Sequence, residues 1–314
     1  MSAPSPDSTP VPPPPHVDLR RGTLWMLFSM VCFTGNSLMI KHFASDRHID
    51  PWLTMSFRFG VGLLMTVAIF YRSGALSVKR SFLSWLLASR GVLGALGTAA
   101  YYHSIGPLGV GKATLIGNTW CVWAAIMAST MLHEKLGLTK FFGIVLALAG
   151  LGLLTNVSAQ NLLVTGHWEM ISLGGAVLAA LVVVVIRQLT RTETSATIFA
   201  SQCLYGLLLA VPFAFHHITH LTTSDVMMLG IAGLCAAFGQ LAMTEGFRFL
   251  TVAVGGAYQI TLPLVISIGG ILLFGEHFSP VQMFGAVLIL AGSFQTVVGI
   301  HWRRLLPKAR SSQA

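Results

Sequence analysis

The residues of this sequence that could bind a solute are polar and aromatic side chains within long apolar runs. Such side chains are costly in hydrocarbon, so each is expected to face a neighbouring helix or a watery cavity. Thr114 and Asn118 are four residues apart, as are Gln240 and Thr244, so each pair shares a helix face. We predict one central pocket formed by Asn36, Tyr101, Tyr102, Asn118, Trp120, Gln240, Tyr258 and Gln259.

Aromatic walls with amide anchors favour a small planar or zwitterionic organic solute over a bare inorganic ion. For Trp120, ordinary packing between helices stays an open alternative. Arg58 lies roughly 5 Å from the middle of the apolar run 51–71, at 1.5 Å per helical residue, and its charge must be neutralised. A substrate carboxylate is one candidate partner; helix-end carbonyls or tyrosine hydroxyls are the other.

The chain that carries these residues is too apolar to be a water-soluble domain. Apolar residues make up 54% of it and charged residues 9%, and the mean hydropathy is +0.75. A membrane-crossing helix needs roughly 20 apolar residues. We predict an all-α membrane protein with ten transmembrane helices, at about 22–43, 51–71, 86–106, 112–132, 138–157, 168–187, 196–216, 226–247, 252–274 and 279–300.

The chain also repeats itself at a constant offset of 142 residues (276 minus 134). The stretch LHEKLGLTKFFGIVLALAG at 132–150 aligns without a gap to FGEHFSPVQMFGAVLILAG at 274–292, and Glu134 matches Glu276. Five spans per copy force the second copy to enter the membrane upside down. We therefore predict two inverted five-helix repeats, at 22–157 and 158–300, and paired repeats of this kind are typical of carriers.

Basic residues concentrate in alternate loops, which the positive-inside rule assigns to the cytoplasm together with both termini. Residues 1–21 are predicted to be a disordered cytoplasmic tail and 301–314 a basic cytoplasmic tail. The protein is expected to be a multi-pass protein of the cell (inner) membrane, surrounded by the lipid bilayer. Glu134 and Glu276 should then lie at opposite faces.

Two titratable residues occupy equivalent positions near opposite ends of their spans. Glu245 is the acid well inside a span, and subtracting 142 gives His103. A buried carboxylate and a histidine near its natural pKa could take up and release protons as access alternates, so the pair is a hypothesis for proton coupling or gating. The alternative is that Glu245 pairs with Arg248, three residues on.

Glycine and proline predict how two of the spans behave. Pro263 falls within the run 252–274, where it frees a backbone carbonyl, and we predict a broken helix and a hinge there. Gly143 and Gly150 are spaced for close packing of one helix against another.

The ten spans, the helix-ending glutamates, Gly275-Glu276-His277 and the G-x6-G spacings of 143–150 and 285–292 resemble the EamA-type carriers of the drug/metabolite transporter superfamily. Arg58 within an apolar run adds to the resemblance, which covers about residues 22–300. His133-Glu134-Lys135 departs from the more usual Gly-Glu-Arg-like triplet. Since such carriers share the arginine while their solutes differ, the resemblance favours a structural role for Arg58.

We accordingly predict a secondary transporter of a small organic metabolite, an amino acid or related solute, that works by alternating access in export or exchange. One alternative is a riboflavin-like vitamin uptake carrier, and another is a membrane-embedded enzyme or sensor. No cofactor, metal site or catalytic residue is expected, and nucleic acid is not an expected partner despite the net charge of +9. A homodimer is compatible with the sequence, although no pattern in it indicates one.

Overall fold

The computed structural model describes residues 18–71, 76, 84–131, 138–155, 166–189, 192–215, 221–250 and 252–298. Every regular element within these ranges is a helix, which confirms the all-α prediction for this part of the chain. The helices are α1 (Leu19–Ser45), α2 (Pro51–Phe70), α4 (Trp85–Leu108), α5 (Val110–Gly117), α6 (Trp120–Met131), α7 (Leu138–Leu154), α8 (His167–Leu189), α9 (Ser195–Ala214), α10 (Thr223–Phe249), α11 (Val252–Phe274) and α12 (Pro280–Val298).

Short polar residues set the points at which these apolar helices begin. Asp50 accepts a hydrogen bond from the Trp52 amide at 2.8 Å, directly before Pro51 opens α2. At the start of α10, Thr222 and Asp225 form a reciprocal capping box. Because the first amides of a helix have no partner within it, such caps fix where each helix starts within its longer apolar run.

Five helices are long and apolar enough to cross a bilayer. They are α1, α2 and α9 over their full lengths, His167–Ile186 of α8 and Thr223–Gly246 of α10. Phe141–Leu154 of α7, Tyr258–Phe274 of α11 and Pro280–Thr296 of α12 are apolar but shorter. The described residues thus contain five clear spans, and the predicted total of ten is not confirmed by them.

The fourth predicted span, 112–132, is two helices, because α5 ends at Gly117 and α6 begins at Trp120. The Asn118 amide donates to the Thr114 carbonyl at 2.9 Å, as in an α-helix, but the Thr119 amide donates to Ile116, three residues back, at 3.1 Å. This tighter turn ends the regular ladder of hydrogen bonds. The chain therefore breaks at Asn118 and Thr119.

The break predicted at Pro263 is absent, since α11 runs from Val252 to Phe274 with the proline inside it. A proline within a helix removes one amide donor, and neighbouring helices of a membrane bundle can accommodate the loss. With the offset of 142, Pro263 corresponds to Cys121, two residues after the turn that breaks the first half. The irregular turn therefore lies in the other half of the chain.

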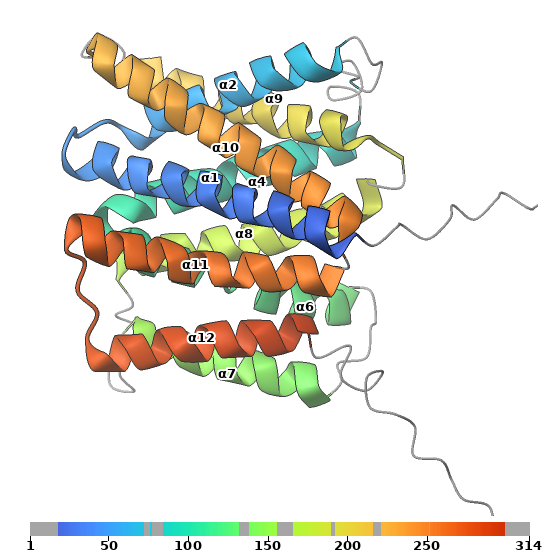
Figure 1. Cartoon of the computed structure of the whole chain (residues 1–314), viewed down its shortest axis with the longest axis vertical. Coiled ribbons are helices and arrows are strands. Elements are labelled where there is room, and N and C mark those ends of the chain that lie inside the picture. Colours follow the sequence, from blue (N-terminus) through green and yellow to red (C-terminus); the bar gives the residue numbers. More distant parts are fainter. Residues whose placement is uncertain are drawn as a thin grey trace, which may run out of the picture.

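The helices pack in pairs that match under the sequence repeat (Figure 1). The pair α1 and α10 corresponds to the pair α4 and α8, and α2 with α10 corresponds to α4 with α9. Likewise the pair α1 and α11 corresponds to the pair α8 and α6. Two further pairs, α2 with α9 and α7 with α12, join each helix directly to its own counterpart. The contacts thus follow the internal repeat.

Glycines bring α7 and α12 into close contact. A Cβ added to Gly143 would lie 2.8 Å from the Gly292 carbonyl oxygen, and one added to Gly150 would lie 2.5 Å from that of Gly285. These distances leave no room for a side chain, which confirms that the glycine spacing serves helix packing. Because the partner numbers fall as the α7 numbers rise, the two helices run in opposite directions.

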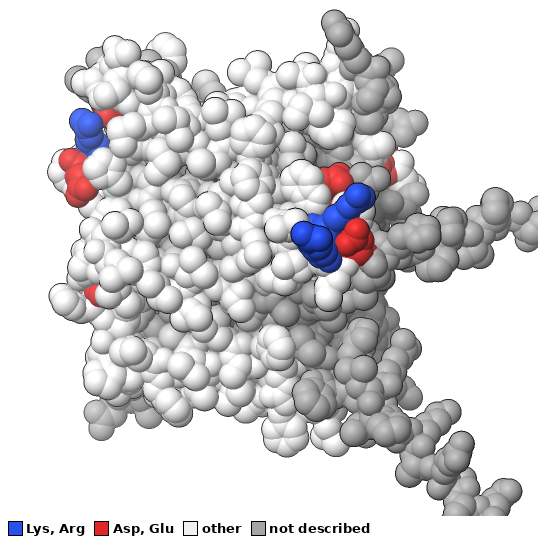
Figure 2. Space-filling view, viewed as in Figure 1, with Lys and Arg blue, Asp and Glu red and all other residues white. Residues whose placement is uncertain are grey.

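The outer surface between the helix ends is apolar. Large side chains such as Leu64 and Leu272 are 72% and 76% exposed. Figure 2 shows the charged side chains of one face gathered at the two ends of the bundle, with none drawn between them. An uncharged face with large exposed aliphatic side chains fits lipid tails rather than water. The first turn of α1 and the last turn of α12 lie at the same end (Figure 1).

Candidate functional site

A cavity of about 310 Å³ lies in the middle of the bundle, with walls from α1, α2, α4, α5, α6, α8, α10 and α11. Seven of the eight residues that the sequence placed in a binding pocket line it. These seven are Asn36, Tyr101, Tyr102, Asn118, Trp120, Gln240 and Gln259. Arg58 and Pro263 also line the cavity. The structure therefore brings together side chains that are up to 233 residues apart, from Phe33 to Ile266 (266 minus 33).

One wall is a hydrogen-bonded group around Arg58. Arg58 Nη1 donates to the Tyr102 hydroxyl at 2.9 Å and to Asn36 Oδ1 at 3.3 Å. Tyr102 donates in turn to Asn36 Oδ1 at 3.2 Å, and Asn36 Nδ2 donates to the Ala232 carbonyl at 2.9 Å. Tyr102 and Asn36 are almost fully buried. This network holds the guanidinium in place at the cavity surface through neutral partners.

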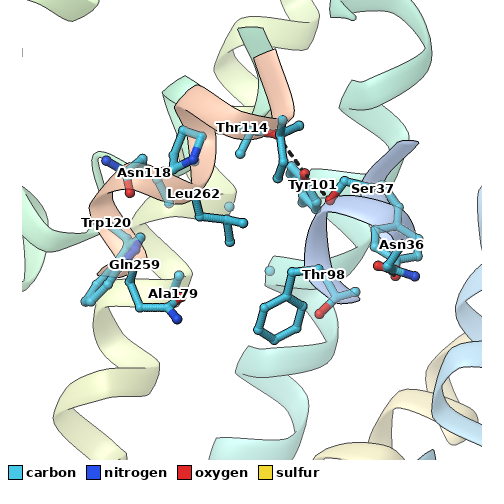
Figure 3. A pocket seen from close by; sticks show the side chains of 18 of the residues that line it. Asn36, Ser37, Thr98, Tyr101, Thr114, Asn118, Trp120, Ala179, Gln259 and Leu262 are labelled. Carbon is cyan, nitrogen blue, oxygen red and sulfur yellow. Dashed lines mark hydrogen bonds between the residues drawn. The ribbon is translucent and has the colours of Figure 1, made fainter. Parts of the chain in front are cut away.

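A second group ties α1, α4 and α5 together around Tyr101 (Figure 3). Thr114 donates its hydroxyl hydrogen to the Val110 carbonyl at 2.6 Å, so its oxygen can only accept from Tyr101, at 2.8 Å. Ser37 must then donate to the Tyr101 oxygen, at 3.2 Å. Each of the three hydroxyl hydrogens thus has one defined acceptor within the protein.

The broken helix forms the opposite side of the cavity. Figure 3 shows Asn118, Trp120 and Gln259 grouped on one side, and Asn36 and Thr98 on the other. Asn118 occupies the turn between α5 and α6, and Trp120 is the first residue of α6. The break therefore places an amide and an indole at the cavity, where an unbroken helix would continue.

Three predicted site residues lie away from the cavity lining. The Tyr258 hydroxyl forms a hydrogen bond with Thr23 at 3.1 Å, close to the start of α1. His103 Nδ1 lies 2.8 Å from the Ala99 carbonyl, and its ring packs edge-on against Trp52 at 4.7 Å. Glu245 lies near the end of α10. The alternative partner proposed for it, Arg248, has a side chain outside the described set.

Sequence reasoning missed one complete wall, which α8 provides. Ser172, Gly175, Ala176 and Ala179 line the cavity, and three of these four side chains carry no polar group. The signal that could have found them is their small size, because it leaves space beside a helix that otherwise contains large aliphatic residues. Ser37 and Thr98 were also missed, as hydroxyl residues are common within membrane helices.

The cavity lies between equivalent positions of the two halves. The offset of 142 holds for the helices that surround it, since Gly239 lies against Phe33 and the equivalent Gly97 lies against Gly175. Six equivalent pairs line the cavity with both members: Phe33 with Gly175, Ser37 with Ala179, Thr98 with Gln240, Tyr101 with Met243, Gly117 with Gln259, and Trp120 with Leu262. Most aromatic and hydroxyl side chains come from the first half.

A further contact joins the halves at the end of the bundle opposite the first turn of α1 and the last turn of α12 (Figure 1). The Glu276 carboxylate accepts from the Val110 amide at 2.6 Å and from the Gly111 amide at 3.0 Å. It thereby caps α5 from the loop that follows α11, which is favourable for a negative charge at a helix start. Gly109, with φ of +86°, provides the turn that precedes α5, and a Cβ there would lie 2.6 Å from Glu276 Oε1.

Comparison with known proteins agrees with the duplicated architecture. The EamA-like transporter family matches this chain twice, at residues 20–156 and 167–298. The chain belongs to the EamA-like transporter family. This assignment confirms the resemblance seen in the sequence, and it makes the protein a member of a transporter family of the membrane.

Two curated proteins of Pseudomonas aeruginosa are similar to this EamA-like chain over most of its length. One is the pseudopaline exporter CntI, 22% identical over 274 residues, which are 87% of this chain and 94% of that protein. The other is the uncharacterized protein PA1977, 25% identical over 287 residues, covering 87% and 93%. A solved crystal structure, 16% identical with a TM-score of 0.58, covers 89% of this chain and 96% of its own, and supports the fold alone.

The cavity of this EamA-like protein is lined mainly by neutral polar and aromatic side chains. Among the described lining residues, Arg58 alone is charged, and amides, hydroxyls and aromatic rings provide the other specific contacts. Pockets of this type fix the orientation of a small organic molecule through a few placed polar groups.

Proposed function

We propose that this protein is a secondary transporter that moves a small organic metabolite, an amino acid or related solute, by alternating access in export or exchange. The observation that carries the proposal is the central cavity, which lies between equivalent positions of two repeats and beside a broken helix. In carriers built from repeats, a solute held at such a position becomes accessible from either face when one part rocks against the other.

The proposed membrane arrangement is ten transmembrane helices in two inverted five-helix repeats, with both termini in the cytoplasm and the protein in the cell (inner) membrane. In this arrangement α5 and α6 together form the fourth span. Counterpart helices that run in opposite directions support it. Besides α7 and α12, these are α2 and α9, in which Phe59 lies against Gly206 and Gly62 against Cys203. An inverted repeat requires this direction, whereas a parallel repeat does not.

Export is favoured over uptake by the similarity to the pseudopaline exporter CntI. The aromatic residues of the cavity would serve a riboflavin-like vitamin as well, so a flavin belongs in the test. The proton-coupling role of His103 and Glu245 stays a prediction, and Glu245→Gln should reduce the pH dependence of transport. Transport by this variant with an unchanged pH profile would contradict that role.

The test of function is a solute screen with the purified protein in liposomes. Amino acids, flavins and nucleotides are loaded one at a time, and counterflow of the labelled solute is measured under an imposed gradient. We expect at least one class to move in a saturable way. A folded, correctly inserted protein that moves none of them but modifies a lipid or binds a partner would instead indicate a membrane-embedded enzyme or sensor.

Trp120→Ala tests whether the cavity is the site that binds the transported solute. It removes an indole from the cavity wall. Contact of the solute with this ring should contribute about 1.4 kcal/mol to binding, so we expect counterflow to fall by about tenfold. Trp25→Ala is the matched control, because Trp25 lies on α1 with 41% of its surface exposed and does not line the cavity. Equal transport by both variants would rule out the cavity as the solute site.

A further inference from the structure

We infer that the solute of this cavity is an organic anion, whose carboxylate binds Arg58 while its apolar or planar part lies against the Trp120 side. The inference rests on the proposed function and adds the chemical class of the substrate to it. It also assigns Arg58 a direct role in binding, in contrast to the structural role that the family resemblance favours.

The first argument is that the Arg58 guanidinium still has donors to offer. A guanidinium carries five N–H groups, and the hydrogen bonds of Arg58 to Tyr102 and Asn36 both come from Nη1. Nε and Nη2 have no hydrogen-bond partner among the described residues, and neither atom is sealed off from solvent. Arg58 lines the cavity, and we take these donors as the ones that a solute there would meet. They form the pair of parallel N–H groups that a carboxylate accepts best.

The second argument is charge. None of the Asp and Glu residues in the described ranges lines the cavity, and no ion pair within those ranges includes Arg58. Its partners, the Tyr102 hydroxyl and Asn36 Oδ1, are neutral dipoles that orient the guanidinium without cancelling its charge. A cation surrounded by protein and lipid is costly until an anion meets it. A cationic solute would increase this cost, and an anionic one would remove it.

The network around Arg58 supports this role because it holds the guanidinium in advance. Asn36 is fixed by the Ala232 carbonyl at 2.9 Å, and it fixes Tyr102 and Arg58 in turn. Little side-chain freedom is then lost when a carboxylate binds. Arg90 provides a contrast, since it is buried off the cavity and donates to Gln202, so no solute in the cavity can reach it.

The opposite side of the cavity accommodates the rest of the molecule. Trp120 and its equivalent Leu262 offer ring and aliphatic surface there. The amides of Asn118 and Gln259 stand at the same side (Figure 3). The cavity therefore has a cationic side and an apolar side with amides, which matches an amphipathic carboxylate.

The test compares acids with their neutral amides, which differ in charge and little in shape. The probes are N-acetyl-phenylalanine, N-acetyl-tryptophan and hippurate, each paired with its carboxamide, and binding to the full-length protein in nanodiscs is measured by calorimetry. For the wild type, we expect at least one acid to bind about tenfold or more tightly than its amide, in line with a charge-assisted bidentate contact. Equal binding of acid and amide, or preference for the amides, would overturn the inference.

Arg58→Gln should reduce acid binding by about tenfold or more and leave amide binding nearly unchanged, so that the preference disappears. Arg58→Lys keeps a charge but not the fork of donors, and should retain part of the preference. Arg21→Gln is the control, since Arg21 lies at the start of α1, outside the cavity. An acid preference in Arg58→Gln equal to that of the wild type would overturn the inference. If this variant does not fold, the inference is tested by the acid and amide pairs with the wild type and with Arg58→Lys.

The outcomes separate this inference from the proposed function. If the liposome screen moves neutral or cationic solutes and no carboxylate, the protein is a transporter and the assignment of an anionic solute is wrong. If no solute of any class binds or moves, the proposed function itself fails and the inference falls with it.

Discussion

The hydroxyl groups beside the cavity are already committed to fixed partners within the protein. Because Thr114 donates to Val110, Tyr101 donates to Thr114 and Ser37 donates to Tyr101, none of these hydrogens is left for a solute. Polar recognition then falls mainly to the guanidinium of Arg58 and to the side-chain amides. This division explains why a cavity rich in hydroxyls can still select for charge.

A glycine in the cavity wall offers a test of occupancy. A Cβ added to Gly117 would meet no atom within 4 Å, so the position has room for a side chain to begin, and Gly117→Leu should fill part of the cavity. We expect transport to fall by more than about tenfold, because a pocket that loses a side-chain volume rejects its ligand, a cost of about 1–3 kcal/mol per methylene group. Counterflow in liposomes measures this effect.

Gly174→Leu is the matched control for this substitution. Gly174 also has nothing within 4 Å, but it is exposed on α8 and does not line the cavity. Transport should be near normal in this variant, with thermal unfolding of both proteins close to that of the wild type. Normal transport by Gly117→Leu would mean that the solute does not occupy the cavity.

At the level of residues, the sequence predicted the lining where burial is expensive and missed it where burial costs nothing. Asn36, Asn118 and Gln240 stood out because an amide within an apolar run needs a polar environment. Gly175 and Ala179 gave no such signal, as small apolar residues pack anywhere. Tyr258 was included on the same reasoning as the amides, but Thr23 satisfies its hydroxyl away from the cavity.

Among the helices, the contact between α7 and α12 depends on the absence of side chains. Gly150→Ala would place a Cβ 2.5 Å from the Gly285 carbonyl oxygen and 2.7 Å from the Ile289 amide, both rigid backbone atoms. The helices must move apart, so we expect the free energy of unfolding to fall by about 1–3 kcal/mol. Thermal unfolding in detergent, followed by loss of the monodisperse species, provides the measurement.

Gly152→Ala makes the same chemical change two residues further along in the same helix. Nothing lies within 4 Å of the added Cβ, and alanine favours a helix over glycine by about 1 kcal/mol. This variant should therefore be as stable as the wild type or slightly more stable. Similar destabilisation of both variants would show that the glycine contact does not hold these helices together.

The Glu276 cap gives a second prediction for the helices. Glu276→Ala removes both acceptors from the first amides of α5, and we expect the free energy of unfolding to fall by about 0.5–2 kcal/mol. Glu276→Gln keeps one neutral acceptor and should lose less. His277→Ala changes the adjacent, exposed residue and is expected to have no effect. Unchanged thermal unfolding of Glu276→Ala would contradict a stabilising cap.

The position of the helix break could not be read from the sequence. Proline is the strongest breaker in local terms, and it directed the prediction to Pro263, where neighbouring helices support a continuous α11. The true break at Asn118 and Thr119 has no proline, and it depends on the Thr119 amide turning to Ile116. The glycine contact of α7 was predictable because its spacing alone specifies it. The Glu276 cap was not, since it joins residues 166 positions apart (276 minus 110).

For the molecule as a whole, the inverted arrangement makes a prediction about sidedness. Single cysteines at Arg21, Glu134 and His277, in a background without the four native cysteines, are labelled with an impermeant maleimide. We expect Arg21→Cys and Glu134→Cys to react in inside-out vesicles, and His277→Cys to react in intact cells. Glu134 lies outside the described residues, and its side follows from the number of predicted spans.

The protein without the four native cysteines is the background control, and since Cys32, Cys121, Cys203 and Cys235 all lie within helices, the wild type should also label weakly. Reaction of Glu134→Cys and His277→Cys from the same face would contradict the inverted repeat.

The repeat and the apolar composition could be recognised in the sequence because both are properties of long stretches. The walls of the cavity could be recognised only in part because they depend on how eight of the described helices meet.

The unlike side chains at equivalent positions have a kinetic consequence. Two identical inverted halves would make the inward-open and outward-open conformations mirror each other in energy, so that a solute would meet the same affinity from either compartment. The difference between Tyr101 and its equivalent Met243, and between Trp120 and its equivalent Leu262, removes that equality. The half-saturating solute concentration should therefore differ between the two sides of the membrane. When equal gradients are applied in opposite directions, the solute should cross faster in one direction than in the other.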